Sequence, residues 1–327
     1  MRILIVGNGN IGTLYGFALS GAGHDVQHLV RPGTLAAQPS VAHLDLLDER
    51  GDREVHRVVP YPWRLTDRAD DPVDIVLVAL RASAAIETVA AIAPQQPDAT
   101  FVVWALAWDG LAALAHVIDP ARIVLGYPDS GGTRDDAGHY VLALGAEPHL
   151  GPTVGAGPAD TTAIGQVTTV LQSAGLEPIH HSDMAGWLRV HAAMTVPYWA
   201  ALARDRDLAA MLRDGRLLRQ AFRAQNEALA VCAASGIDLG GYPEVDMVRM
   251  PAVLFPFAFR WLFRRNESMR RVTAHGVDGL AEARPLYAAM LAEAEARAVP
   301  ATNLRALGRW LEIGAPDASD AGARRSA

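Results

Sequence analysis

The stretch RILIVGNGNIG, residues 2–12, stands near the start of this 327-residue chain. Its aliphatic first half predicts a buried strand, and the apolar period that continues to Leu19 predicts a helix. The glycines between them follow the pattern G-x-G-x-x-G, in which the backbone turns tightly, approaches a diphosphate and aims the helix N-terminus at it. The predicted dinucleotide-binding turn consists of Gly7, Asn8, Gly9, Asn10, Ile11 and Gly12.

The second predicted strand, residues 25–30, ends at Arg31. At this place an NAD site carries an acidic residue that bonds the ribose hydroxyls. A guanidinium instead matches the charge and geometry of a 2′-phosphate, so we expect the cofactor to be NADP. The alternative is that Arg31 is an ordinary solvated charge at a strand end. His28, on the same strand, is expected to pack rather than to bind.

Predicted strands and helices alternate through the first part of the chain, interrupted by a hairpin over residues 43–47 and 54–59. This alternation is typical of an α/β fold with a doubly wound, mostly parallel sheet of the Rossmann type. One predicted helix there covers residues 110–118. After the Gly- and Pro-rich stretch 151–160, nearly every segment has helical period, including residues 206–235. The expected domains are an NADP-binding Rossmann domain (1–160), a mostly α-helical substrate and dimerisation domain (161–313) and a disordered tail (314–327).

Composition excludes several classes of protein. Half of the residues are apolar and 20% are charged, which excludes intrinsic disorder and coiled coils. The net charge of −7 gives no general attraction to nucleic acid or to an acidic membrane. Cys232 is the single cysteine, so no internal disulfide forms and a reducing, cytoplasmic location is expected. We expect neither a signal peptide nor a metal site.

All 29 basic residues are arginine, because the sequence contains no lysine. Chemistry that requires a lysine, such as a Schiff base or a lysine general acid, is therefore excluded. Arginine still binds phosphates, through a planar fork of N–H donors.

Residues 250–263, MPAVLFPFAFRWLF, form a strongly apolar segment. The segment is too short to span a bilayer and contains two prolines. We interpret it as a buried helix or a dimer contact in preference to a membrane-touching loop. A homodimer formed through the helical domain is therefore expected, with a small-molecule substrate and with neither nucleic acid nor membrane as a partner.

Together these features resemble the ketopantoate reductase family over roughly residues 1–310. In the segment VALRA, residues 78–82, Arg81 stands where the family has a lysine, and the resemblance implies that it contacts the adenosine phosphate. GYPDSGG, residues 126–132, matches a second family segment. A longer helical motif aligns from Asp183 through Trp187 to Leu202. The resemblance implies an NADP-dependent reductase with a Rossmann domain and a helical domain.

The substrate-site positions depart from the family. The lysine that protonates the ketone oxygen falls on Arg189, and two asparagines fall on Ala193 and Pro197. These positions are four residues apart, so they share one face of a helix. A further asparagine falls on Ala107 or on Asp109, depending on the alignment.

The resemblance places two catalytic groups of the family on Arg189 and Glu282, and the reasoning from the residues adds His191, which lies on the same helix as Arg189. A guanidinium stabilises a developing alkoxide but is a poor proton donor, so a second group is needed. His191 is the preferred donor; the alternatives His180, His181 and Tyr198 stay open. The family carboxylate falls on Glu282 when counted back from Pro300, or on Leu280 when counted from the family serine, Ser268. Glu227 also matches a family position and is expected to anchor helices.

Two functions remain open at this point. One is an NADP-dependent reductase of a C=O or C=N bond in a small molecule other than ketopantoate. The other is a Rossmann-fold protein that has lost hydride transfer, and that binds nucleotide for regulation or catalyses a non-redox reaction.

Overall fold

The computed structural model describes residues 1–51, 53–153, 162–274 and 279–311. The contacts divide the chain into two compact units: Met1–Arg189 with Leu262–His275, and Val190–Trp261 with Gly276–Ala327. The tail for which we expect disorder, residues 314–327, lies outside the described residues.

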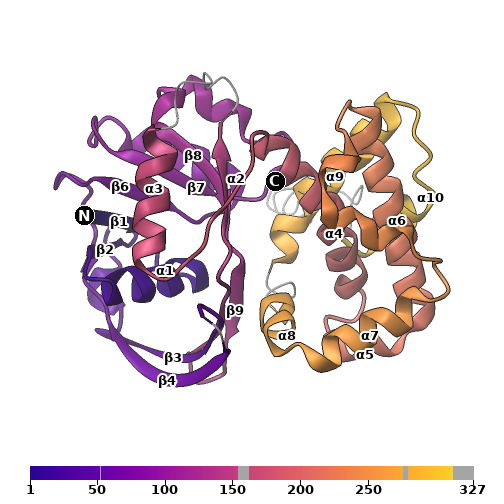
Figure 1. Ribbon diagram of the computed structural model, residues 1–327, viewed down its shortest axis with the longest axis horizontal. Helices are drawn as coiled ribbons and strands as arrows, with labels where there is room; N and C mark the ends of the chain where they lie inside the picture. Colours follow the sequence, from indigo (N-terminus) through magenta and orange to yellow (C-terminus); the bar gives the residue numbers. More distant parts are fainter. Residues whose placement is uncertain (52, 154–161, 275–278, 312–327) are drawn as a thin grey trace, which may run out of the picture. The chain divides into compact units, whose positions relative to one another are not determined.

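The first unit is built on a sheet of eight strands (Figure 1). In order across the sheet these are β12 (Ile179–His180), β11 (His149–Pro152), β8 (Ile123–Tyr127), β7 (Thr100–Trp104), β6 (Ile75–Val78), β1 (Arg2–Val6), β2 (Asp25–Leu29) and β5 (Leu65–Thr66). β2, β1, β6, β7 and β8 pair in parallel, whereas β11 runs antiparallel to β8. All residues of β6 and β7 are buried, as in parallel strands covered on both faces. The predicted α/β class is confirmed.

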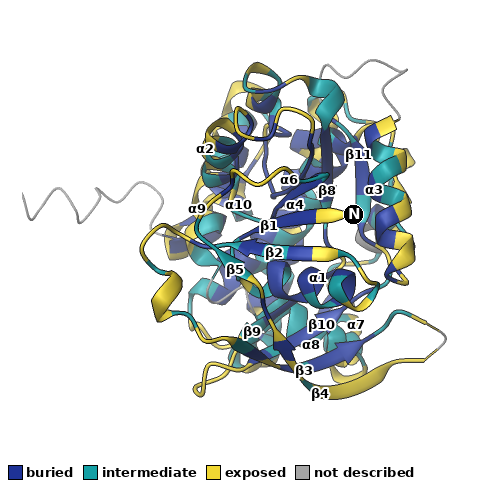
Figure 2. Ribbon diagram, turned by 90° about the vertical axis from the view of Figure 1, so that its left-hand side faces the viewer, coloured by how far each residue is buried: buried dark blue, intermediate teal, exposed yellow. Residues whose placement is uncertain are grey.

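A second sheet of four strands belongs to the same unit. Its order is β4 (Val55–Pro62), β3 (Val41–Asp48), β10 (Tyr140–Leu144) and β9 (Ser130–Arg134). β3 and β4 form the predicted hairpin, with Leu44 opposite Val59. Helix α1 (Asn10–Gly21) lies between the two sheets, with β2 on one side and β9 and β10 on the other (Figures 1 and 2). The hairpin therefore covers the helix that the glycine turn begins.

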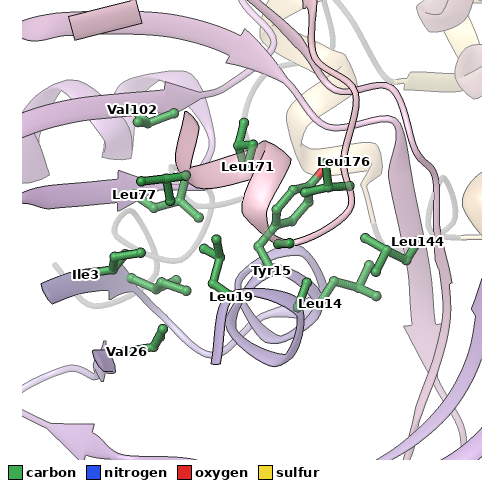
Figure 3. Packing of buried hydrophobic residues seen from close by; sticks show 14 of the residues in the cluster. Ile3, Leu14, Tyr15, Leu19, Val26, Leu77, Val102, Leu144, Leu171 and Leu176 are labelled. Carbon is green, nitrogen blue, oxygen red and sulfur yellow. The ribbon is translucent and has the colours of Figure 1, made fainter. Parts of the chain in front are cut away.

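The core of this unit lies around α1. Leu14, Tyr15 and Leu19 of that helix are at most 3% exposed and meet apolar side chains of β1, β6 and helix α3 (Thr162–Ser173) (Figure 3). The Tyr15 ring packs edge-on against Trp104, with 4.2 Å between ring centroids. Each such side chain stabilises the fold by roughly 1.5–3 kcal/mol through burial.

The first unit extends beyond residue 160, where we expected the helical domain to begin. α3 packs on β8, β11 and α1, and β12 adds a strand beside β11. The change of unit therefore falls at residue 189. Helical period alone does not say on which core a helix packs, so the sequence placed this boundary earlier than the contacts do.

Two helices predicted from helical periodicity differ in the structure. The predicted helix over 110–118 is only a 3-10 turn at Ala112–His116, because Gly110 and Leu111 adopt left-handed conformations. The predicted helix over 206–235 is two helices, since the Asp214 carboxylate caps a second N-terminus at Arg216 and Leu217.

The remaining α-helices are α2 (Ala82–Ile92), α4 (Met184–Ala203), α5 (Leu208–Arg213), α6 (Gly215–Ala234), α7 (Phe255–Arg265), α8 (Glu267–Ala274), α9 (Leu280–Ala296) and α10 (Thr302–Gly308). Short 3-10 turns cover Leu35–Ala37, Pro120–Arg122, Leu239–Gly241, Pro243–Arg249 and Arg309–Leu311. In the second unit, Glu227 on α6 accepts hydrogen bonds from the backbone of Asn303 and Leu304 at the start of α10. The expected anchoring role of Glu227 is confirmed.

The apolar segment 250–263 is only partly buried. Phe255 and Phe263 are buried, whereas Val253, Leu254, Phe257 and Trp261 keep 54–67% of their surface exposed. Of the two interpretations, the buried helix holds only in part, because α7 buries one face and exposes the other. A dimer contact through this segment stays a prediction. Across the described part of the chain, no helix has both the length and the apolar character needed to cross a bilayer.

Gly16 of α1 permits a close contact between the helix and two polar side chains. A Cβ atom there would lie 2.4 Å from Nε2 of His28 and 2.8 Å from the Tyr61 hydroxyl oxygen. Both residues are buried, so neither side chain has space to move away. Their arrangement therefore depends on a glycine at position 16.

We expect Gly16→Ala to lower the free energy of unfolding by about 2 kcal/mol, the usual cost of overpacking a core. The matched control is Gly165→Ala on α3, where no atom of the part of the chain that the structure describes lies within 4 Å of the new Cβ. That control is expected to gain up to about 1 kcal/mol of helix stability. Denaturant unfolding measures both variants. Equal stability of Gly16→Ala and wild type would contradict the contact.

Burial lowers the pKa of His28 from 6.5 to about 4. Between these pH values His28 binds a proton in the unfolded chain but not in the folded chain. His28 therefore makes the free energy of unfolding fall as the pH falls from 6.5 towards 4. We expect His28→Phe to reduce this slope by up to about 1.4 kcal/mol per pH unit. Tyr61→Phe, which keeps the imidazole, should retain the slope. Denaturant unfolding across this pH range measures it, and an unchanged slope in His28→Phe would refute the assignment.

Candidate functional site

The predicted glycine turn links β1 to α1. Gly7 adopts a left-handed conformation (φ +90°), which favours glycine. At Gly12 a Cβ would lie 3.0 Å from the Gly7 carbonyl oxygen, so the glycine lets the helix approach the strand. Gly9 is different: among the described residues, no atom lies within 4 Å of its Cβ position, and no side chain caps the helix there. The turn thus leaves open space before uncapped amides, which fits a bound diphosphate.

Three neighbouring strands bring the predicted coenzyme residues to one edge of the sheet. β1 lies between β6 and β2, and all three run parallel. The glycine turn follows β1, Arg31 lies two residues after β2, and Arg81 lies three residues after β6. Both arginines are exposed. The carboxyl edge of such a sheet is where this class of fold binds ligands.

The backbones of Arg31 and Arg81 each occupy a defined place in the fold. The Arg31 carbonyl accepts hydrogen bonds from the backbone N–H and the hydroxyl of Thr34. Arg81 occupies the N-cap position of α2 in an extended conformation. Their contact with a coenzyme phosphate stays a prediction.

Side chains from three strands, β2, β9 and β10, hold the rear of the glycine turn. Nδ1 of His28 lies 3.0 Å from the Gly7 carbonyl oxygen. The Asn8 carbonyl accepts from the Tyr140 hydroxyl at 2.7 Å and from Nη2 of Arg134 at 2.9 Å. Arg134 also covers the Tyr140 ring, with its guanidinium carbon 4.3 Å from the ring centroid. Sequence reasoning missed Arg134, Tyr140 and this use of His28, because no local pattern marks them.

The two asparagines of the turn have protein partners. Nδ2 of Asn8 donates to Oε1 of Gln38 at 2.8 Å, and Nδ2 of Asn10 donates to the Gly132 carbonyl at 2.7 Å. These bonds occupy the side-chain amides of Asn8 and Asn10, and the contact of the turn residues with a coenzyme stays a prediction. Beside Asn8 lies a pocket of about 170 Å³, whose lining includes Gln38, Trp63 and Arg134.

Arg189, a predicted catalytic residue, lies on α4 in the first unit. Its guanidinium carbon is 4.9 Å from the ring centroid of Trp108, which follows β7. The loop after Trp108 packs on α4, since a Cβ at Gly110 would lie 2.6 Å from the Ala185 Cβ. Trp108 was not predicted. An aromatic face beside a guanidinium holds the cation in a defined place.

Neither candidate for the missing asparagine supplies an amide. Ala107 is buried, and the Asp109 carboxylate accepts from the Leu111 N–H at 3.1 Å. On α4, Ala193 and Pro197 are buried as well, so these positions also provide no polar group.

His191 and Glu282 belong to the second unit, in α4 and in the first turn of α9. Their joint action with Arg189 stays a prediction. The alternative donor Tyr198 gives its hydroxyl hydrogen to Gln225, and burial raises its pKa well above the usual value. Its hydroxyl is therefore held in the helical unit.

The two other histidine candidates point to different partners, as expected for adjacent residues. Nε2 of His180 lies 3.3 Å from the Thr168 hydroxyl oxygen. His181 lies 2.8 Å from Nδ1 of His149, whose ring stacks on Trp187 with 4.1 Å between centroids. Burial lowers the pKa of His149 to about 4. Ser268 on α8 donates to Glu49, so protein contacts occupy it too.

Comparisons with known proteins agree with this geometry. A family model described as Ketopantoate reductase PanE/ApbA matches residues 3–155. No curated protein matches the sequence. The solved 2-dehydropantoate 2-reductase of Geobacter metallireducens GS-15 is similar in fold, with a TM-score of 0.70 at 19% identity over 95% of this chain and 99% of that chain.

Other solved structures share the fold. D-mandelate dehydrogenase with NADH and anilino(oxo)acetate has a TM-score of 0.70 at 12% identity, over 95% of this chain and 97% of its own. A dimeric ketopantoate reductase from Staphylococcus aureus has a TM-score of 0.65 at 7% identity, over 95% and 98%. The match to the ketopantoate reductase PanE/ApbA model therefore covers residues 3–155, and the solved structures share the fold over 95% of the chain.

Proposed function

We propose that the protein is an NADP-dependent oxidoreductase of the ketopantoate reductase type, which reduces a C=O or C=N bond of a small molecule other than ketopantoate. The observation that carries the proposal is the glycine turn with its uncapped helix N-terminus, flanked by Arg31 and Arg81 at neighbouring strand ends. NADPH would supply the hydride. The turn would bind its diphosphate, and the arginines its adenosine phosphate.

The preference for NADP over NAD rests on Arg31. One solved structure of this fold is described with NADH, so the fold by itself does not select the coenzyme. No acidic residue occupies the position after β2, where a ribose 2′-hydroxyl would be bonded. A guanidinium there favours a phosphate by charge and by bidentate geometry.

The surroundings of Arg189 favour a substrate other than ketopantoate. In our proposal Arg189, held by Trp108, stabilises negative charge on the oxygen or nitrogen that receives the hydride. His191 donates the proton, and Glu282 orients a polar group of the substrate. Ala193 and Pro197 offer no amides for ketopantoate, and each lost buried polar contact costs about 1–3 kcal/mol. These departures favour a different substrate.

One observation favours the second candidate, a nucleotide-binding protein without hydride transfer. Arg189 replaces a proton-donating lysine with a group that does not release its proton. Binding of coenzyme without turnover on any carbonyl or imine substrate would support that alternative.

A cytoplasmic location and a homodimer through the helical domain complete the proposal. The exposed apolar residues Val253, Leu254, Phe257 and Trp261 support an interface there. One protein of the same fold is described as dimeric. A single cysteine, the buried Cys232, fits a reducing compartment.

We expect the purified protein to bind NADPH more tightly than NADH. Arg31→Ala should weaken NADPH binding roughly 10- to 100-fold, the worth of a charge-assisted hydrogen bond, and should leave NADH affinity unchanged. Arg2→Ala is the matched control, because Arg2 begins β1 at the opposite edge of the sheet. Isothermal titration calorimetry measures all three proteins. Equal affinity of wild type for the two coenzymes would refute the phosphate assignment.

We expect NADPH oxidation with a carbonyl or imine substrate from a screened panel, and negligible turnover of ketopantoate. Arg189→Gln should lower kcat at least 100-fold with that substrate, because it removes the charge that stabilises the transition state, while NADPH affinity stays within a factor of two. Stopped-flow absorbance of NADPH follows the reaction. Robust turnover of ketopantoate would show that the altered residues 189, 193 and 197 do not exclude it.

A further inference from the structure

We propose that His28 is a positioning residue of the coenzyme site, which fixes the glycine turn through the Gly7 carbonyl and is itself oriented by Tyr61. The inference rests on the proposed function, since it assigns the turn to a coenzyme diphosphate. It gives a role to a buried histidine that the proposed reaction does not use.

The hydrogen bonds define a directed chain. A carbonyl oxygen only accepts, so Nδ1 of His28, 3.0 Å from the Gly7 oxygen, carries the hydrogen. In a neutral imidazole the other nitrogen then accepts, and the Tyr61 hydroxyl lies 3.0 Å from Nε2 as its donor. The Tyr61 oxygen is left to accept from the Ser20 hydroxyl at 3.3 Å. The order is Ser20, Tyr61, His28, Gly7.

The neutral form of His28 is favoured by its surroundings. The residue is 0% exposed. Its ring meets the edges of Tyr61 and Trp63, with centroids 5.8 and 5.6 Å away. The lowered pKa, which burial causes, agrees with one hydrogen on the ring. An imidazole in this cage has one tautomer and one orientation available.

The position of Gly7 explains why its carbonyl matters. The Gly7 N–H already donates to the Leu29 carbonyl at 2.8 Å, so with His28 both polar groups of Gly7 are bonded to β2 residues. The peptide between Gly7 and Asn8 is thereby fixed with its oxygen toward the rear. If this peptide rotated, a carbonyl oxygen would face the anionic diphosphate, and the following amides would lose their alignment. Holding it in advance spares that reorganisation on binding.

Tyr61 brings the hairpin into this arrangement. It lies on β4, and Gly16 is the position on α1 that leaves room for it and for His28. The strand that covers α1 therefore also sets the tautomer of the histidine behind the glycine turn. This link gives the hairpin a part in coenzyme binding without any contact to the coenzyme.

The test compares His28→Phe, which keeps a ring of similar size but has no donor, with Tyr61→Phe and wild type. We expect His28→Phe to weaken NADPH and NADH binding by the same factor, about tenfold, because the turn contacts the diphosphate that both coenzymes share. Arg31→Ala differs in affecting NADPH alone. In steady-state kinetics we expect His28→Phe to raise the KM for the coenzyme and to leave kcat unchanged. His28→Asn, whose amide can donate and accept, should recover part of the affinity.

The tautomer of His28 can be measured by NMR spectroscopy, independently of coenzyme binding. In ¹⁵N–¹H correlation spectra of wild type, His28 should show the Nδ1–H tautomer, and Tyr61→Phe should make the ring populate both tautomers. Calorimetry measures the affinities, and thermal unfolding checks that the variants are folded. If His28→Phe does not fold, Tyr61→Phe replaces it in the test. We expect Tyr61→Phe to bind both coenzymes about threefold more weakly than wild type.

The outcomes separate the two proposals. If wild type binds neither coenzyme, the proposed function fails, and the coenzyme role of His28 fails with it. If wild type binds coenzyme but the folded His28 and Tyr61 variants bind equally well, the positioning role alone is overturned. An Nε2–H tautomer in wild type would also overturn it, since Nδ1 would then have no hydrogen for Gly7.

Discussion

The amides at the start of α1 are the physical feature on which the rest of the site depends. A helix N-terminus attracts an anion only if its N–H groups are left without protein acceptors and the approach to them is clear. Here no atom of the described residues lies near the Cβ position of Gly9, which leaves the approach to the amides open. Gly9 is also the N-cap residue, and no side chain caps the helix there. Gly7 and Gly12 allow the strand and the helix to meet closely enough for the turn to form. The same turn sets α1 against the sheet and creates the core around Tyr15.

Side chains of both sheets hold this turn. The Gly7 carbonyl is bonded by His28 of the first sheet, and the Asn8 carbonyl by Tyr140 and Arg134 of the second. Tyr61, on the hairpin strand β4, orients His28 in turn. A loop whose carbonyls are already satisfied loses little freedom when a ligand binds, so its contacts translate more fully into affinity.

The absence of lysine shapes the proposed chemistry. Arginine serves well where a phosphate is to be held, because its fork matches phosphate oxygens and its charge does not depend on pH. In the proposed reaction, an arginine at position 189 would separate charge stabilisation from proton transfer, since a guanidinium can supply the first and not the second. Another group would then have to move the proton, or the protein would catalyse a reaction that needs no proton transfer. The stacking of Arg189 on Trp108 shows how the fold holds this cation.

The sequence by itself determined the strand, glycine turn and helix at the N-terminus, the alternating α/β order, the hairpin, and the placement of Arg31 and Arg81 at strand ends. These features follow from the periodicity of apolar residues and from the residue types in turns, both of which depend on residues that are close in sequence. Only the tertiary structure decided where the first unit ends, that α7 exposes an apolar face, and which side chains hold the turn. Arg134 and Tyr140 lie 126 and 132 residues from Asn8, and Tyr61 lies 33 residues from His28. No local pattern encodes such pairs, because strand order in the two sheets brings them together only when the chain has folded.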